Sequence, residues 1–150
     1  MTITHGHFTI ERVLRATPAR VFAAWSSTKA MLQWFHGPAE WGAPNLEIDF
    51  RIGGGGRSSA GPKGGVPHRF ESRYYDIVEN ERIVYAYEMY SGPKRMSVSL
   101  ATIELQAVPG GTRLVLTEQG AFIDESWGGN DSREQGTRGL LEQLAAEVEK

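Results

Sequence analysis

The stretch of sequence that decides the fold is Asp131-Ser-Arg-Glu-Gln-Gly-Thr-Arg-Gly-Leu-Leu-Glu-Gln-Leu-Ala-Ala-Glu-Val-Glu-Lys150. Asp131 followed by Glu134 resembles a capping box, with aspartate in place of the usual serine or threonine, and predicts the start of a helix. This amphipathic helix closes a chain that otherwise reads mostly as strands, so its apolar stripe requires a sheet to lie against. At helical spacing the stripe comprises Thr137, Leu140, Leu141, Leu144 and Val148.

Length and composition indicate one ordinary soluble domain spanning residues 1–150. Hydrophobic residues make up 40% of the chain and charged residues 23%, which is typical of globular proteins. The net charge of -2 gives no global reason to expect nucleic acid or an acidic membrane as partner. No apolar run approaches the roughly 20 residues that span a bilayer. Residues 1–7 lack the pattern of a signal peptide, so the cytoplasm is the expected location.

The sequence offers no motif for a metal or another cofactor, and we expect none. Cysteine is absent, which excludes disulfides, thiol nucleophiles and cysteine metal sites. His5 and His7 supply only two imidazoles, whereas zinc sites use three or four ligands. The glycine run 53–56 lacks the Gly-Lys-Ser/Thr ending of a phosphate loop, and no serine-nucleophile or dinucleotide motif occurs. No motif compels catalysis, so whether the protein is an enzyme stays open.

The remainder of the chain predicts antiparallel strands joined by tight turns. Apolar and polar residues alternate in short runs bounded by glycine, proline and asparagine. Two short helices interrupt the pattern after the first run, one capped by Thr17 and one by Thr28. Parity changes near Tyr74 and after Leu100 predict two bulges, which would bend the sheet around the last helix. The class is therefore α+β. The strand runs are 7–15, 46–52, a short one after the turn at 53–56 that leads toward Gly61, 69–78, 83–89, 96–107 and a last one around Leu114 and Leu116.

Several stretches outside the final helix carry a resemblance to a known family. They are Phe8-Thr-Ile-Glu-Arg-Val-Leu-Arg-Ala16, Pro18-Ala-Arg-Val-Phe-Ala-Ala-Trp25, Met31-Leu-Gln-Trp-Phe-His-Gly-Pro38, Tyr74-Tyr-Asp-Ile-Val-Glu-Asn-Glu-Arg-Ile-Val-Tyr-Ala-Tyr87 and Gly110-Gly-Thr-Arg-Leu-Val-Leu-Thr-Glu-Gln-Gly120. With them the chain resembles the SRPBCC or START-like superfamily. More narrowly, it is similar to bacterial members of the family named for activators of the large heat-shock-protein ATPase.

This resemblance implies a helix-grip fold, in which a curved antiparallel sheet wraps around the long C-terminal helix. It also implies a cavity between sheet and helix that often binds an apolar small molecule, with the two short helices near one end. Strand parity and helical phase aim mainly aromatic and apolar residues at this cavity, although the same residues would also suit a solid core. They are Trp34, Phe35, Phe50, Tyr85, Tyr87, Met89, Phe122, Trp127, Thr137, Leu141 and Leu144.

Two charged residues are candidates to orient the polar end of a ligand. Arg133 continues the stripe of the last helix toward its start, and Glu118 breaks the alternation of the last strand. The alternative places both side chains in solvent. Glu118 or His36 would also serve as general acid or base if the cavity held an active site.

Three functions follow from these patterns. The leading hypothesis is a protein that holds a hydrophobic or aromatic small molecule between sheet and helix. The first alternative is a chaperone ATPase-stimulating interaction module, which predicts an exposed apolar patch around Trp41 and Trp127. The second is a cyclase- or hydrolase-type enzyme in the same cavity. The sequence leaves the ligand and the oligomeric state open, a homodimer included.

Overall fold

The computed structural model describes residues 2–150, which form seven strands, three α-helices and one short 3-10 helix. In chain order these are β1 (Thr4–Leu14), α1 (Pro18–Ala23), α2 (Thr28–Met31), the 3-10 helix η1 (Ala39–Trp41), β2 (Asn45–Ile48), β3 (Gly55–Ala60), β4 (His68–Val78), β5 (Arg82–Ser91), β6 (Lys94–Val108), β7 (Gly111–Phe122) and α3 (Gly129–Val148). The α+β class is confirmed.

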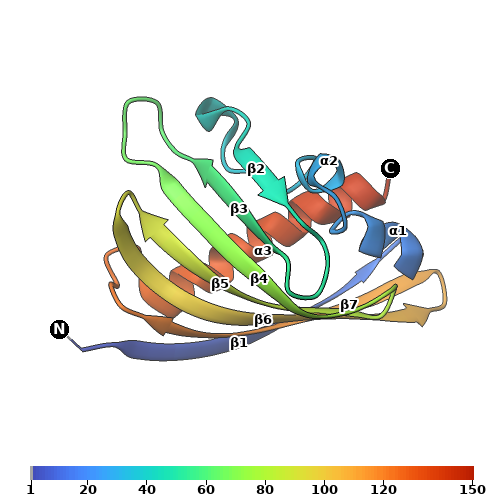
Figure 1. The fold of residues 1–150 in the computed structure, drawn as a ribbon. Coiled ribbons are helices and arrows are strands. Elements are labelled where there is room, and N and C mark those ends of the chain that lie inside the picture. Colours follow the sequence, from blue (N-terminus) through green and yellow to red (C-terminus); the bar gives the residue numbers. More distant parts are fainter. Residues whose placement is uncertain (1) are drawn as a thin grey trace.

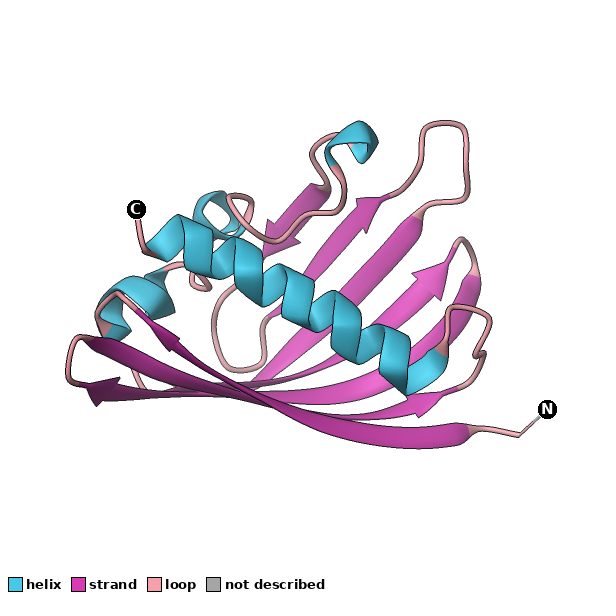
Figure 2. Ribbon diagram, turned by 180° about the vertical axis from the view of Figure 1, so that it is seen from behind, coloured by secondary structure: helices cyan, strands magenta, loops and turns pink. Residues whose placement is uncertain are grey.

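The strands form one curved sheet in the order β1-β7-β6-β5-β4-β3-β2, with every neighbouring pair antiparallel. Helix α3 crosses the concave face of this sheet, and α1 and α2 lie beside its C-terminal end (Figures 1 and 2). The first and last strands in the chain, β1 and β7, are paired along the full length of β1. The predicted helix-grip arrangement is therefore confirmed.

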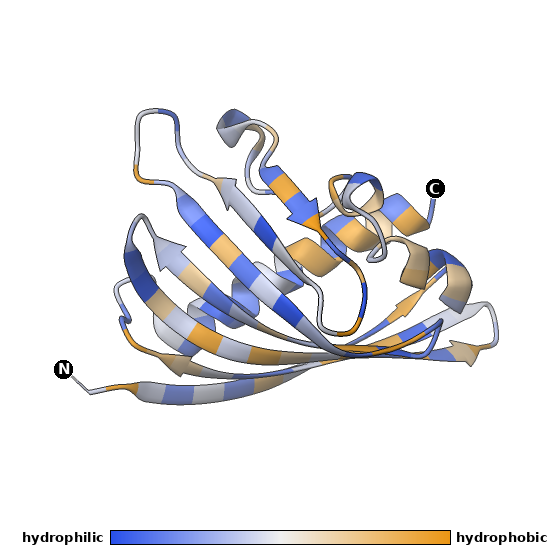
Figure 3. Ribbon diagram, in the orientation of Figure 1, coloured by the Kyte–Doolittle hydropathy of each residue, from blue (hydrophilic) through white to orange (hydrophobic). Residues whose placement is uncertain are grey.

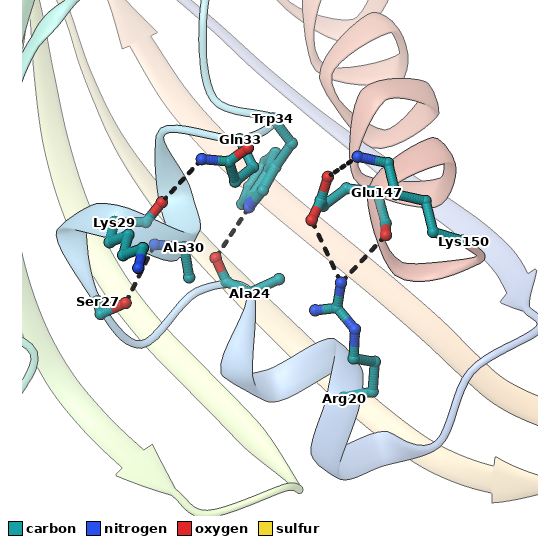
Figure 4. Close-up of polar contacts among 9 residues, drawn as sticks. All are labelled: Arg20, Ala24, Ser27, Lys29, Ala30, Gln33, Trp34, Glu147 and Lys150. Atoms are coloured by element: carbon teal, nitrogen blue, oxygen red, sulfur yellow. Dashed lines mark hydrogen bonds and ion pairs between the residues drawn. The ribbon is translucent and has the colours of Figure 1, made fainter.

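Short polar side chains determine where the two small helices begin. The hydroxyl of Thr17 accepts a hydrogen bond from the backbone N–H of Arg20 at 3.2 Å, as predicted for α1. Helix α2 is capped by Ser27, which accepts from Ala30 N–H at 3.1 Å (Figure 4), so the predicted cap at Thr28 is wrong by one residue. The hydroxyl of Thr28 instead accepts from a backbone N–H of β2 and thereby ties the helix to the sheet.

Helix α3 begins two residues before the predicted capping box. Its N-cap is Gly128, whose φ of 98° is left-handed and suits glycine, and no side chain caps the first turn. Glu134 forms an ion pair with Arg138 one turn later and so does not reach back to Asp131. The capping-box prediction is therefore wrong, because the chain enters the helix through a glycine turn.

The C-terminal half of α3 is attached firmly to the rest of the molecule. Arg20 of α1 donates to the backbone carbonyl of Glu147 at 3.1 Å and forms an ion pair with its carboxylate (Figure 4). Gln143 donates to the carbonyl oxygens of Trp34 and His36 at 2.5 and 3.1 Å. These contacts surround the apolar stripe, of which Leu141, Leu144 and Val148 are buried, and Ala145 beside the stripe is buried as well.

The strand predicted for residues 46–52 is shorter in the structure. Strand β2 ends at Ile48, and a turn then leaves the side chain of Ile52 59% exposed. Phe50 packs edge-on against Phe22 and Tyr74, with ring centroids 5.5 and 5.1 Å apart. The glycines that follow Ile52 close this turn, because two of them donate or accept backbone hydrogen bonds with Tyr74 on β4. The alternation of apolar and polar residues in the sequence does not reveal such a turn.

One of the two predicted bulges is in its expected place. The register of β4 against β5 shifts between Tyr74 and Asp76, as parity predicted. The bulge predicted after Leu100 is wrong: the shift in the β5–β6 pair lies at Met96. Val98 and Leu100 therefore point away from the core and are 39% and 38% exposed. Figure 3 shows hydrophilic and hydrophobic residues alternating along the strands.

Truncation of Leu144, which is 0% exposed, tests the grip of α3 on the sheet. We expect Leu144→Ala to lower the free energy of unfolding by about 2–5 kcal/mol, because it leaves a cavity under the helix. The measurement is urea denaturation followed by circular dichroism. Leu100→Ala on the outer face is the matched control and should change stability by less than about 0.5 kcal/mol. Equal losses for the two variants would contradict this account of the core.

Candidate functional site

A cavity of about 580 Å³ lies between the inner face of β3–β7 and the N-terminal half of α3. The interior is therefore not the solid core that the alternative interpretation allowed. This volume falls within the range of roughly 300–1,000 Å³ that is usual for sites binding drug-sized molecules. The segment that follows α2, through Pro38 and Trp41 to Pro44, forms the remaining side.

The two halves of α3 pack differently against the sheet, and this difference leaves the cavity open. The helix backbone lies nearest to β1 and β7, at one edge of the sheet, and its buried side chains begin only at Leu141. Before that point, Ser132, Gly136 and Gly139 line the cavity. A Cβ atom on either glycine would meet no atom within 4 Å. Arg133, Thr137 and Leu140 line the cavity from the same part of α3. The two glycines are exposed, so they border the cavity at its open side without adding a side chain.

Sequence reasoning missed these two glycines, although a signal for them exists. A glycine inside a helix costs about 1 kcal/mol relative to alanine. Gly136 and Gly139 carry this cost in the middle of α3, and no close contact requires them to be glycine. A residue that is unfavourable in a helix and has no close neighbour is a signal in the sequence for a position where a side chain is absent beside a cavity.

Aromatic rings from the sheet and from the helical segment after β1 form a nearly continuous wall, and all of them except Tyr74 line the cavity. Consecutive rings make edge-on or tilted contacts, with centroids between 4.6 and 6.1 Å apart. The indole N–H of Trp34 donates to the carbonyl of Ala24 at 2.9 Å, which fixes this ring beneath the cavity (Figure 4). In order of contact the rings are Trp25, Trp34, Phe35, Phe70, Tyr87, Tyr85 and Tyr74.

Three rings from separate parts of the chain meet at the rim of the cavity. His68, at the start of β4, stacks on Trp127 with ring centroids 4.4 Å apart, and the edge of Trp41 approaches it at 5.0 Å. Burial lowers the pKa of His68, which favours its neutral form. Trp41 and Trp127 thus line the cavity, whereas the chaperone hypothesis placed them in an apolar patch on the outer surface.

A polar cluster occupies the end of the cavity beneath the first turns of α3. Arg133 donates through Nη1 to the hydroxyls of Tyr87 and Ser99, at 3.0 and 3.2 Å, and through Nη2 to Ser97 at 2.7 Å. Tyr87 in turn donates its hydroxyl hydrogen to Glu118, whose Oε1 atom lies 3.7 Å from Arg133 Nη1. Arg133 and Glu118 are thus inside the molecule, and the solvent-facing alternative is wrong for both.

Small residues on β6 make room for this cluster. Ser99 pairs across the sheet with Tyr87, and Ala101 pairs with Glu118. Because Ser97, Ser99 and Ala101 are short, the longer side chains of β5 and β7 meet above them. The two serines were missed because the sequence analysis placed the neighbouring apolar residues on the inner face. Ile103 and Leu105 face inward, and counting back from them in steps of two residues would have identified both serines.

Burial governs the protonation of the cluster. Burial raises the pKa of Glu118, while the hydrogen bond from Tyr87 and the charge of Arg133 oppose this effect. Burial likewise raises the pKa of Tyr87, and the neighbouring carboxylate raises it further. Tyr87 therefore keeps its proton at neutral pH and donates it to Glu118 in a hydrogen bond.

The structure brings most of the predicted site residues together around one space. Phe50 is an exception, because it packs behind the aromatic wall against Phe22 and Tyr74. Leu144 is the other, because it belongs to the packed half of α3. That the remaining residues bind a ligand stays a prediction. Those that line the cavity are Trp34, Phe35, Tyr85, Tyr87, Met89, Glu118, Phe122, Trp127, Arg133, Thr137 and Leu141.

The two acidic residues that precede α3, Asp124 and Glu125, each have a partner. Asp124 pairs with Lys94 and accepts a hydrogen bond from Ser126 N–H at 2.8 Å, while Glu125 points away and accepts from Thr4. Within residues 2–150, no cluster of three or more His, Cys, Asp or Glu side chains has a metal-binding arrangement. None of the helices among these residues has both the length and the hydropathy needed to cross a bilayer.

Comparison with known families decides the classification of this fold and cavity. The model of the family "Activator of Hsp90 ATPase homolog 1-like protein" matches residues 15–149. The chain belongs to this family. Its resemblance to the SRPBCC or START-like superfamily is thereby confirmed. No curated protein matches the chain significantly.

Solved structures of similar proteins agree with this membership. An uncharacterised protein from Rhizobium leguminosarum is 44% identical, with a TM-score of 0.92 over 99% of this chain and 97% of that chain. The Mll3558 protein from Rhizobium loti is also 44% identical, with a TM-score of 0.89 over 99% of this chain and 100% of that chain. An AHSA1-like protein from Aeromonas hydrophila, 18% identical, shares the fold with a TM-score of 0.73 over 96% and 92% of the two chains.

The ion pair between Lys94 and Asp124 predicts a measurable titration. Lys94, together with the N–H of Ser126, holds the pKa of Asp124 at about 2, below its ordinary 3.8. The ionised carboxylate therefore favours folding above the ordinary pKa, and this contribution is lost as the pH falls toward about 2. We expect Lys94→Met to raise the pKa of Asp124, as measured by NMR of its carboxyl carbon.

Lys150→Met is the control for this titration, because Lys150 pairs with Glu147 at the other end of the helix. It should leave the titration of Asp124 unchanged. An Asp124 pKa that is the same in Lys94→Met and the original protein would contradict the assignment of the shift to this ion pair.

Proposed function

We propose that the protein binds a hydrophobic or aromatic small molecule in the cavity between the sheet and α3. The observation that carries this proposal is an apolar cavity of about 580 Å³ with a buried group of hydrogen-bonding side chains at one end. A largely apolar pocket with a few convergent polar groups is the usual form of a small-molecule site.

The aromatic wall supports a flat ring system as the apolar part of the ligand. Its rings are held by their contacts with each other and, for Trp34, by a hydrogen bond, so little side-chain entropy is lost on binding. Burial of apolar ligand surface contributes roughly 25 cal/mol per Å² before the costs of association are subtracted. A two- or three-ring molecule would therefore gain most of its affinity from this wall.

The polar cluster supports a single polar group at one end of the ligand. Arg133 and Glu118 are nearly buried, with side chains 16% and 5% exposed. Their contact with the cavity places a donor and an acceptor where an otherwise apolar molecule would present an oxygen or nitrogen atom. This end of the cavity would set the orientation of the ligand.

A plug in the cavity tests the proposal without disturbing the core. Gly136→Leu places a larger side chain where a Cβ meets no atom within 4 Å, and leucine is a good helix former. We expect the unaltered protein to bind the uncharged fluorescent probe N-phenyl-1-naphthylamine saturably. The variant should bind it roughly tenfold more weakly or worse, because the leucine competes for the same space.

Ala146→Leu is the matched control, since Ala146 lies on the exposed side of the same helix. It should bind the probe as the unaltered protein does, and thermal unfolding should show that both variants are folded. A thermal-shift screen of fatty acids, flavonoids and polyketide-like aromatics then narrows the ligand class. Absence of saturable probe binding, or equal binding by the plugged variant, would refute the proposal.

A second candidate function is proton transfer by Glu118, as an enzyme of the cyclase or hydrolase type would use. The observation that favours it is a buried carboxylate that faces the cavity with a raised pKa. Such a group would act as a general base toward a carbon acid bound against the aromatic wall. Arg133 would stabilise the negative charge that develops on the substrate.

A simple reaction tests Glu118 as a base before any natural substrate is known. In 5-nitrobenzisoxazole, a base removes the ring C–H proton, the electron pair forms a nitrile, and the N–O bond breaks to release a coloured phenolate. We expect Glu118→Gln to slow this reaction by a factor on the order of 100 or more. Glu134→Gln, at an exposed ion pair, is the control. Equal rates in the protein and Glu118→Gln would exclude the base.

A further inference from the structure

The charged groups at the polar end of the cavity balance one another. Arg133 carries a positive charge and Glu118 a negative one, with 3.7 Å between their nearest atoms. Burial raises the pKa of Glu118, whereas the hydrogen bond from Tyr87 and the charge of Arg133 favour the ionised carboxylate. The other acidic group in the cavity lining, Asp124, is paired with Lys94. A ligand therefore meets a pair of opposite charges with no excess of either sign.

The hydrogen bonds within the cluster leave one donor side and one acceptor side available. Arg133 uses both Nη1 hydrogens and one Nη2 hydrogen to bind Tyr87 and the two serines, which leaves its Nε–H and the second Nη2–H without an acceptor among residues 2–150. Glu118 accepts from Tyr87 through Oε1, and its Oε2 atom receives no hydrogen bond from any of these residues. Tyr87 itself both donates and accepts, so its hydroxyl is already satisfied.

We infer that the cavity selects an uncharged ligand whose polar group both donates and accepts a hydrogen bond, such as a phenol, an alcohol or an amide. The ligand oxygen accepts from the Arg133 guanidinium, and the ligand O–H or N–H donates to Glu118 Oε2. This inference rests on the proposed function and specifies the ligand class of the same site.

Charged ligands are disfavoured by the same arrangement. A carboxylate would gain from Arg133 what it loses to repulsion by Glu118, and a cation would experience the reverse. Neither ion recovers the cost of leaving water for an apolar cavity. An uncharged hydroxyl or amide has a much smaller desolvation cost, and it pairs with both protein groups.

Three probes that share one ring system test the inference. They are 2-naphthol, 2-naphthoate and 2-(aminomethyl)naphthalene, which are neutral, anionic and cationic at neutral pH. Their affinities are measured by displacement of N-phenyl-1-naphthylamine and by calorimetry. We expect the protein to bind 2-naphthol roughly tenfold or more tightly than either ion, because only the neutral probe avoids the desolvation of a charge.

Two variants should shift this preference in opposite directions. Glu118→Gln leaves an excess positive charge and should move the preference toward 2-naphthoate. Arg133→Gln leaves an excess negative charge and should move it toward the ammonium probe. Glu134→Gln, which removes a charge from an exposed pair on the same helix, should not alter the preference. Circular dichroism checks folding, and the affinity ratio in the unaltered protein is informative even if one variant fails to fold.

The outcomes separate this inference from the proposed function. Binding of all three probes with similar affinity, or an unchanged preference in both folded charge variants, would overturn the inference and leave ligand binding intact. Failure of every probe, N-phenyl-1-naphthylamine included, would overturn the proposed function and the inference with it. Selective binding of 2-naphthol, with opposite shifts in the two variants, would establish both.

Discussion

The apolar packing of helix α3 against the sheet is confined to its C-terminal half, whereas its first turns reach the sheet through polar contacts of Asn130 and Arg133. The cavity depends on this asymmetry. Leu141, Leu144 and Val148 fill the space between helix and sheet at that end. At the other end Thr137 and Arg133 take the positions that face the sheet, and the exposed Gly136 and Gly139 border the cavity without a side chain. A helix is stiff over its length, so anchoring one half also positions the other. The N-terminal half of α3 is therefore held in place although the space beneath it stays open. This arrangement allows a cavity inside a small domain.

The buried pair of Arg133 and Glu118 is not a stabilising device. Replacement of such pairs by apolar residues is often neutral or favourable for folding, because desolvation costs offset the attraction of the charges. Here the pair lies at the end of an apolar cavity, where serines of β6 and the hydroxyl of Tyr87 satisfy part of its hydrogen-bonding capacity. The cluster is held by strands on one side and a helix on the other, which is the kind of support that the proposed ligand site requires.

Membership in the activator-like family accounts for the scaffold more than for the site. A protein only 18% identical has the same fold over nearly the whole chain. Helix-grip architecture therefore tolerates wide changes in sequence, as long as strand alternation and the stripe of the final helix are kept. A shared fold does not by itself identify the residues that bind a ligand. Function has to be argued from the side chains that line the cavity.

The sequence by itself determined the element order, the α+β class, the cap at Thr17 and the bulge at Tyr74, because these follow from local chemistry and periodicity. The family resemblance added the helix-grip arrangement. Only the tertiary structure decided that Phe50 leaves its strand and that Ser97 lies on the inner face of β6 beside Arg133, since a turn or a one-residue shift reverses strand parity. It also decided that Glu118 lies beside Arg133. Their contact joins a strand and a helix across the cavity, and no local pattern encodes that distance.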